Sequence, residues 1–106
     1  EWRTAAPLPL PLANAGVAVD ESRIFVAGGT TLDNSGELAL SDHFFSYSPA
    51  GNLWSERGRL PLPLSGAALV KAGDDLYLLG GWDGGSVRAE VWRIPASAAD
   101  VAWLIS

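Results

Sequence analysis

Short apolar runs separated by turn residues recur along the chain, and their length is that of β-strands. Four of these runs cover residues 15–19, 24–27, 67–71 and 76–79. Polar residues and glycine fill the connections at 20–22 and 73–75, as they do in tight turns. Because the runs lack polar alternation, they predict strands that are covered on both faces.

Two further strands are expected in each half of the chain. The third strand is predicted over residues 43–47 and 88–94, and the fourth begins near Trp54 and near Trp103. No segment repeats apolar residues at the spacing of an amphipathic helix, and the seven prolines and twelve glycines oppose helix formation. The pattern therefore predicts an all-β chain.

The two halves of the sequence are copies of one another. Trp2 and Trp54 have the same separation along the chain as Gly28 and Gly80, so this part of the match needs no gap. The alternating leucines and prolines of residues 8–12 fall on those of residues 60–64 in the same register. A period of about 50 residues is typical of solenoids and propellers. Neither half is then expected to form a domain by itself.

These residues resemble the Kelch repeat, in which a hydrophobic strand ends in Gly-Gly and is followed by a loop, Tyr-x-Pro and Trp. The matching segments are residues 24–29, 47–49 and 54 in the first copy, and residues 76–81, 95 and 103 in the second. The resemblance implies two four-stranded antiparallel Kelch-type blades, a partial propeller. Residues 1–57 would form the first repeat with a preceding fourth-strand segment, and residues 58–106 the second. Both would belong to one propeller domain, in a ring of about four to eight blades.

The resemblance also assigns structural roles and marks departures from the family pattern. It gives a structural role in the repeat to Trp2, Gly28, Gly29, Tyr47, Trp54, Tyr77, Gly80, Gly81 and Trp103. Leu12 and Leu64 stand where Kelch repeats often carry an arginine before the first strand, and Arg93 stands where the second copy would have tyrosine. The position of the third strand in the second copy therefore stays open.

Composition narrows the range of partners. The 106 residues carry 12 acidic and 7 basic side chains, a net charge of −5, and these charges are scattered. This balance argues against a nucleic acid partner, and no apolar stretch of about 20 residues predicts membrane insertion. The chain begins with glutamate and has two tryptophans at fourth-strand positions near its ends. We therefore expect further blades, from a longer parent chain or from other subunits.

No catalytic residue, metal ligand or cofactor site is assigned from the sequence, and enzyme activity is left open. The residues that follow Gly28-Gly29 provide neither the lysine nor the helix of a phosphate-binding loop. The oxygen-bearing side chains of residues 33–37 have a spacing that suits calcium, although such turns are usually only solvated. His43 is the single histidine and no cysteine is present, which excludes a copper site like that of galactose oxidase. A surface or structural role is predicted for His43. No cellular compartment is assigned from the sequence.

The loops offer the best candidates for function. In Kelch propellers one face carries the loops that commonly hold partners, and here that face would include residues 30–41 and 82–87, with residues 57–65 nearby. The candidate residues for binding a protein partner are Asp33, Glu37, Arg57, Arg59, Trp82, Asp83 and Arg88. The favoured interpretation is a protein-binding or scaffold module. The alternatives are part of a sugar-converting propeller enzyme, mutarotase-like or galactose-oxidase-like, with its active site on other blades, and a structural accessory subunit of a larger assembly.

Overall fold

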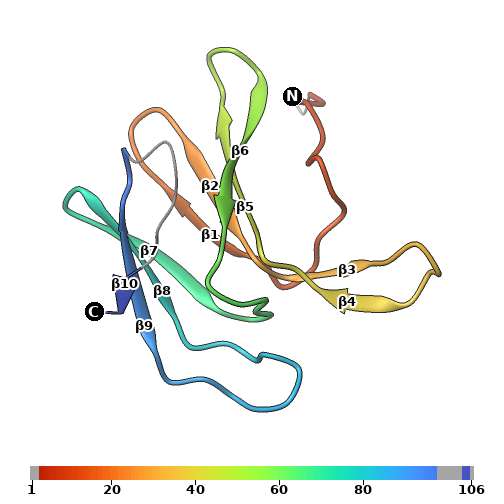
Figure 1. The fold of residues 1–106 in the computed structure, drawn as a ribbon. Helices are drawn as coiled ribbons and strands as arrows, with labels where there is room; N and C mark the ends of the chain where they lie inside the picture. Colours follow the sequence, from red (N-terminus) through yellow and green to blue (C-terminus); the bar gives the residue numbers. More distant parts are fainter. Residues whose placement is uncertain (1–2, 98–103, 106) are drawn as a thin grey trace.

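The computed structural model describes residues 3–97 and the backbone of residues 104–105, and its regular elements are all strands (Figure 1). A first sheet has the order β1-β2-β5-β6 and a second sheet the order β10-β9-β8-β7, all antiparallel. The strands of the first sheet are β1 (Gly16–Val19), β2 (Ile24–Ala27), β5 (His43–Ser48) and β6 (Leu53–Arg59). Those of the second are β7 (Ala68–Ala72), β8 (Asp75–Leu79), β9 (Val91–Pro95) and β10 (Leu104–Ile105). The all-β prediction with two four-stranded sheets is confirmed.

A third, two-stranded sheet lies outside the two large ones. It is a hairpin of β3 (Thr30–Leu32) and β4 (Leu38–Leu40), which projects away from both four-stranded sheets (Figure 1). The prediction that residues 30–41 form a loop is wrong. Strands of three residues separated by a polar turn are too short for periodicity to reveal.

The third strand of the second sheet begins later than predicted. It starts at Val91 instead of residue 88. The backbone N–H of Arg88 donates to the carbonyl oxygen of Gly81 at 2.7 Å, and Gly80 donates to Glu90 at 3.0 Å. These bonds pair residues 88–90 with Gly80 and Gly81, but the register shifts by one residue at Arg88, so the regular strand begins only at Val91. The Arg88 side chain forms ion pairs in the loop.

The core lies between the two four-stranded sheets, which pack face to face with β1 beside β7. From the first sheet it receives Phe25, Ala27 and Phe44, and from the second Leu69, Leu76, Leu78 and Ile94. Leu64, in the crossing that joins the sheets, is completely buried in the same core. It therefore fills space between the sheets with an apolar side chain, whereas Kelch repeats often carry a polar arginine at this position.

The outer faces of the two sheets are less covered than the sequence predicts. Val17 and Val19 of β1 are 56% and 61% exposed, whereas Ala18 between them is buried. On the second sheet, Val70 and Leu79 point away from the core and are exposed. β1 and β7 are thus open on one face, whereas consecutive residues of β2 and β5 are buried on both faces. Each open face has the apolar character of a surface that packs against another sheet.

Part of the outer face of the first sheet is covered by the segment that precedes β1. The indole N–H of Trp54 donates to the carbonyl oxygen of Ala6 at 2.9 Å, and the N–H of Ala6 donates to Oδ1 of Asn52 at 2.9 Å. The Tyr47 hydroxyl donates to the same Asn52 oxygen, and its ring lies 4.9 Å from that of Trp54. Tyr77 occupies the equivalent repeat position of Phe25 on the outer face of the second sheet, where it is half-buried. Trp2 and Trp103 lie outside the described residues.

The glycine pair after β2 makes a close approach to the neighbouring segments. Gly28 and Gly29 have φ angles of +68° and +101°, in the left-handed region. The N–H of Gly29 donates to the carbonyl oxygen of Leu64 at 2.7 Å. The pair therefore forms a corner of the sheet. Within residues 3–97 and 104–105 the fold contains no helix with the length and apolarity needed to cross a membrane.

Candidate interaction surface on the loop face

Two hairpin-like segments lie at the same end of the sheets and are joined through Ser65. One is the β3–β4 hairpin, and the other is the loop of residues 82–90, in which Trp82 and Val87 form an antiparallel bridge. Ser65 and Trp82 exchange backbone hydrogen bonds at 2.9 and 3.0 Å. The hydroxyl oxygens of Thr30 and Ser65 lie 2.9 Å apart. We call the hairpin and the loop together the loop face.

The register of the hairpin decides which of its side chains face the loop. Thr30 exchanges both backbone hydrogen bonds with Ala13, on the side away from β4. The pairs Thr30↔Leu40 and Leu32↔Leu38 are therefore of the non-hydrogen-bonded type, and their side chains share one face of the hairpin. A Cβ built on Gly84 would lie 3.4 Å from Cδ1 of Leu40, so this face is turned toward the loop.

The side chains on this shared surface are apolar and unusually exposed. Leu38 and Val87 are 77% and 82% exposed, and Leu32 and Trp82 are 58% and 47% exposed. We call these four residues the apolar patch. Large hydrophobic side chains exposed together on one surface mark contact sites more often than single ones do. Trp82 is among the residues predicted from the sequence, but the leucines are not, because only the hairpin places Leu32 and Leu38 on one face.

Asp33 closes the turn of the hairpin. Its Oδ1 accepts hydrogen bonds from the N–H and hydroxyl of Ser35 at 2.9 and 2.6 Å, and from the N–H of Glu37 at 3.0 Å. These bonds, the Ser35 hydroxyl first, hold the pKa of Asp33 below its usual range. This Asp33 oxygen, whose spacing in the sequence suits calcium, thus already orders the turn. The turn leaves Glu37 exposed to solvent.

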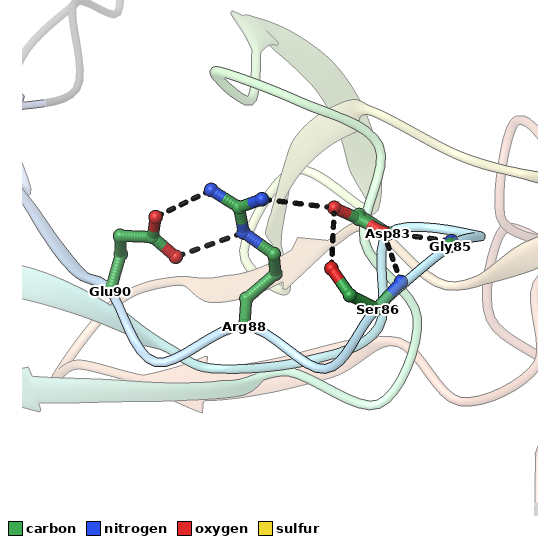
Figure 2. A network of polar contacts seen from close by, with 5 residues as sticks. All are labelled: Asp83, Gly85, Ser86, Arg88 and Glu90. Atoms are coloured by element: carbon green, nitrogen blue, oxygen red, sulfur yellow. Dashed lines mark hydrogen bonds and ion pairs between the residues drawn. The ribbon is translucent and has the colours of Figure 1, made fainter.

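Arg88 lies between two carboxylates in the loop (Figure 2). Its Nε and one terminal nitrogen donate to the two oxygens of Glu90 at 2.9 and 2.5 Å, and its other terminal nitrogen donates to Asp83 at 3.1 Å. Asp83 also accepts from the N–H groups of Gly85 and Ser86, both at 2.8 Å. One cation therefore faces two anions, and the network carries net negative charge.

The two carboxyl groups owe their lowered pKa values to different causes. Hydrogen bonds from the Gly85 and Ser86 N–H groups come first in lowering the pKa of Asp83, whereas the Arg88 side chain comes first for the pKa of Glu90. Since both folded pKa values are depressed, the contacts stabilise the loop at neutral pH. Their contribution is lost as the pH falls through those lowered values.

Replacing Arg88 with glutamine is expected to raise the pKa of Glu90 more than the pKa of Asp83, because Asp83 keeps its backbone donors. A carboxyl carbon NMR titration of the parent protein and of Arg88→Gln measures both values. Arg93→Gln removes an exposed arginine from β9 and serves as the matched control. A larger change at Asp83 than at Glu90 would contradict the arrangement.

Arg59 lies at the end of β6 in a chain of polar contacts. It donates to Asp42 at 2.7 Å and to Nε2 of His43 at 3.2 Å, while Nδ1 of His43 lies 2.8 Å from Glu56. An arginine can only donate, so Nε2 accepts and the proton of the neutral ring is on Nδ1, facing Glu56. His43 also stacks on Phe45 with ring centroids 5.3 Å apart. The chain of contacts is consistent with the surface or structural role predicted for His43.

Arg57 is placed apart from the other six candidate residues. Its side chain lies over the ring of Phe25 at 5.9 Å and donates to the carbonyl oxygen of Ala96 at 3.1 Å. Burial comes first in lowering its pKa, followed by the nearby charge of Arg23. Arg57 therefore joins the two sheets, and we do not include it in the loop face.

Comparison with known proteins decides the family. No family model matches the chain. Over 85 residues it is 33% identical to Kelch repeat and BTB domain-containing protein 12 of Danio rerio, covering 76% of this chain and 14% of that protein. The chain belongs to the Kelch-repeat family. Its two four-stranded sheets are Kelch blades, and the prediction of a partial propeller is confirmed.

Two other relatives extend the comparison. The chain is 30% identical over 92 residues to spermatocyte protein spe-26 of Caenorhabditis elegans, covering 87% of this chain and 15% of that protein. It is 32% identical over 83 residues to N-acetylneuraminate epimerase of Haemophilus influenzae strain PittEE, covering 76% of this chain and 22% of that protein. This Kelch chain thus spans less than a quarter of the length of these relatives.

A solved structure supports the same fold. The structure of YjhT superposes with a TM-score of 0.87 at 15% sequence identity, over 100% of this chain and 41% of that one. At this level of sequence identity the structural similarity supports only the fold, that is, the arrangement of the Kelch blades.

Proposed function

We propose that these two Kelch blades hold a protein partner on the loop face. The observation that carries the proposal is the apolar patch: the leucines of the β3–β4 hairpin and Trp82 and Val87 of the loop are all exposed, on two segments that Ser65 joins. Tryptophan is among the residues that contribute most when buried at an interface. The sheets fix the positions of both segments, so that little order has to be gained on binding.

The charged residues set the rim of this surface. Asp33 and Glu37 lie at the tip of the hairpin, and Asp83 and Arg88 lie in the loop beside Glu90. Arg59 is paired with Asp42 and contributes little free positive charge. A polar rim around an apolar centre is the usual anatomy of a protein interface.

The expected result of replacing Trp82 with serine is a loss of partner affinity of roughly thirtyfold, the size of a hot-spot residue. The measurement uses the full-length protein, with its partner identified by cross-linking from the native source and the affinity determined by calorimetry. Leu53→Ser is the matched control, because Leu53 is 62% exposed but lies in the first sheet outside the loop face.

Unchanged affinity in Trp82→Ser, and in a second variant with Leu38→Ser, would overturn the proposal. Cross-links confined to the outer rim of the blades, around β6, would instead support a structural accessory subunit. Both variants alter exposed side chains, and thermal melting verifies that they fold like the parent.

The identity with N-acetylneuraminate epimerase motivates a second candidate, a propeller enzyme that acts on a sugar. In that case its catalytic residues would lie on other blades. Among the described residues no group of three or more histidine and acidic side chains is arranged to hold a metal, and Leu64 and Ala67 are buried between the blades. Proton NMR of N-acetylneuraminate with the full-length protein tests this: faster interconversion of its isomers would favour the enzyme.

A further inference from the structure

The hairpin has a free hydrogen-bonding edge along β4. Ser41 donates to Gly29 at 2.8 Å and Asp33 donates to Glu37 at 2.8 Å, which places the β3–β4 bonds at alternate residue pairs. The N–H and C=O groups of Leu38 and Leu40 therefore point away from β3. Within the described part of the chain no hydrogen bond reaches these groups. An unpaired edge of this kind is a template for another strand.

The edge lies next to the apolar patch. Leu38 contributes its backbone groups to the edge and its side chain, 77% exposed, to the patch. An extended segment added beside β4 would place every second side chain on the face that holds Leu32, Leu38 and Leu40. Those side chains should be apolar, since they would cover the leucines.

The opposite face of the hairpin calls for a different side chain. Because successive residues of a strand alternate between faces, Glu37 and Ala39 lie on the face away from Leu38. Neither Asp33 nor Glu37 forms an ion pair with a described residue. Arg88 already pairs with two other carboxylates of the loop, so it does not neutralise Asp33 or Glu37. The remaining side chains of an added strand should therefore be basic.

We infer that the free edge of β4 accepts an extended segment of a partner protein in which apolar and basic residues alternate. The inference rests on the proposed function, since it names the chemistry of the partner at the loop face. Backbone hydrogen bonds to Leu38 and Leu40 would supply the register, and the leucines and Glu37 would select the sequence.

Three short synthetic peptides test the inference on the full-length protein. The first alternates valine and lysine, the second alternates valine and glutamate, and the third repeats the first with N-methyl groups on the amides of alternate residues. The valine–lysine peptide is expected to bind and the other two to bind at least about tenfold more weakly. Equal binding of the valine–glutamate peptide would overturn the charge argument, and equal binding of the N-methylated peptide would overturn strand addition.

Protein variants separate the backbone from the side chains. Leu38→Pro removes an N–H that faces outward and leaves every β3–β4 hydrogen bond in place, whereas Leu38→Ala removes only side-chain atoms. Leu38→Pro is expected to weaken binding of the valine–lysine peptide about tenfold more than Leu38→Ala. Glu37→Gln should weaken it severalfold, and Glu21→Gln, on an exposed turn at the end of β1, should leave it unchanged. The inference would be overturned if Leu38→Pro and Leu38→Ala weakened binding equally. It would also be overturned if Glu37→Gln and Glu21→Gln had equal effects.

Hydrogen exchange supplies an independent readout. The amides of Leu38 and Leu40 are expected to exchange rapidly in the free full-length protein and to become protected by the valine–lysine peptide. Protection already in the free protein would mean that another segment of the protein itself covers the edge, which overturns the inference. If a partner depends on Trp82 but is not displaced by this peptide, the inference is wrong and the proposed function stands. If the partner is indifferent to Trp82, the proposed function itself fails.

Discussion

Replacing Gly28 with alanine is expected to lower the free energy of unfolding by about 3 kcal/mol, the joint effect of backbone strain and a steric clash. The residue has a φ angle of +68°, and a Cβ built on it would lie 2.4 Å from the carbonyl oxygen of Leu64. That oxygen belongs to the backbone and already accepts a hydrogen bond from Gly29 at 2.7 Å. The clash cannot be relieved by a side-chain rotation, so the crossing between the blades must move.

Gly36→Ala is the matched control for this prediction. Gly36 has a φ angle of +86°, but a Cβ built there meets no atom within 4 Å. It should therefore show only the left-handed backbone cost of about 1 kcal/mol. Urea unfolding of the full-length protein measures both values, and the difference between them isolates the contact with Leu64. Equal losses for the two variants would contradict the close approach.

The repeat carries most of the predictable fold. Tryptophans, glycine pairs and proline crossings recur in one register, and each of these residue types has a backbone or packing requirement that is visible in the sequence. The strands around them were therefore placed within a few residues, as at β2 and β8. The start of β9 was misplaced because the backbone pairing of residues 88–90 with Gly80 and Gly81 shifts register at Arg88, which hydrophobic periodicity does not report.

The candidate surface was less predictable, for a different physical reason. Trp82 and Arg88 could be recognised by residue type, but their surroundings depend on long-range register. The β3–β4 hairpin is fixed by Ala13 and Ser65, which come from two different crossings between strands. Arg57 could not be assigned to the contact between the blades, because its partner, the carbonyl oxygen of Ala96, belongs to the other repeat.

Replacing Phe25 with alanine is expected to lower the free energy of unfolding by about 4 kcal/mol, the middle of the range for deleting a buried aromatic side chain. Phe25 is 0% exposed and stacks on Phe44 with ring centroids 6.0 Å apart. The guanidinium groups of Arg23 and Arg57 lie over its ring at 4.9 and 5.9 Å. The cavity left by alanine would be bounded by two opposed sheets, which can close it only by shifting together. Thermal or urea unfolding of the full-length protein measures the loss, and a change below about 1 kcal/mol would contradict the position of Phe25 in the core.

The unfolding measurement, applied to a substitution of Tyr77, tests whether another blade packs on the second one. Tyr77 holds the repeat position of Phe25 but lies on the outer face of the second blade, beside the exposed Val70 and Leu79. A third blade that packed there as the second packs on the first would bury it. Tyr77→Ala would then cost about 3 kcal/mol in the full-length protein. Without such a blade the ring stays half-solvated, and the loss should be below about 1 kcal/mol. Because the two substitutions remove similar aromatic side chains from equivalent positions, the difference between them reports the coverage of the second blade.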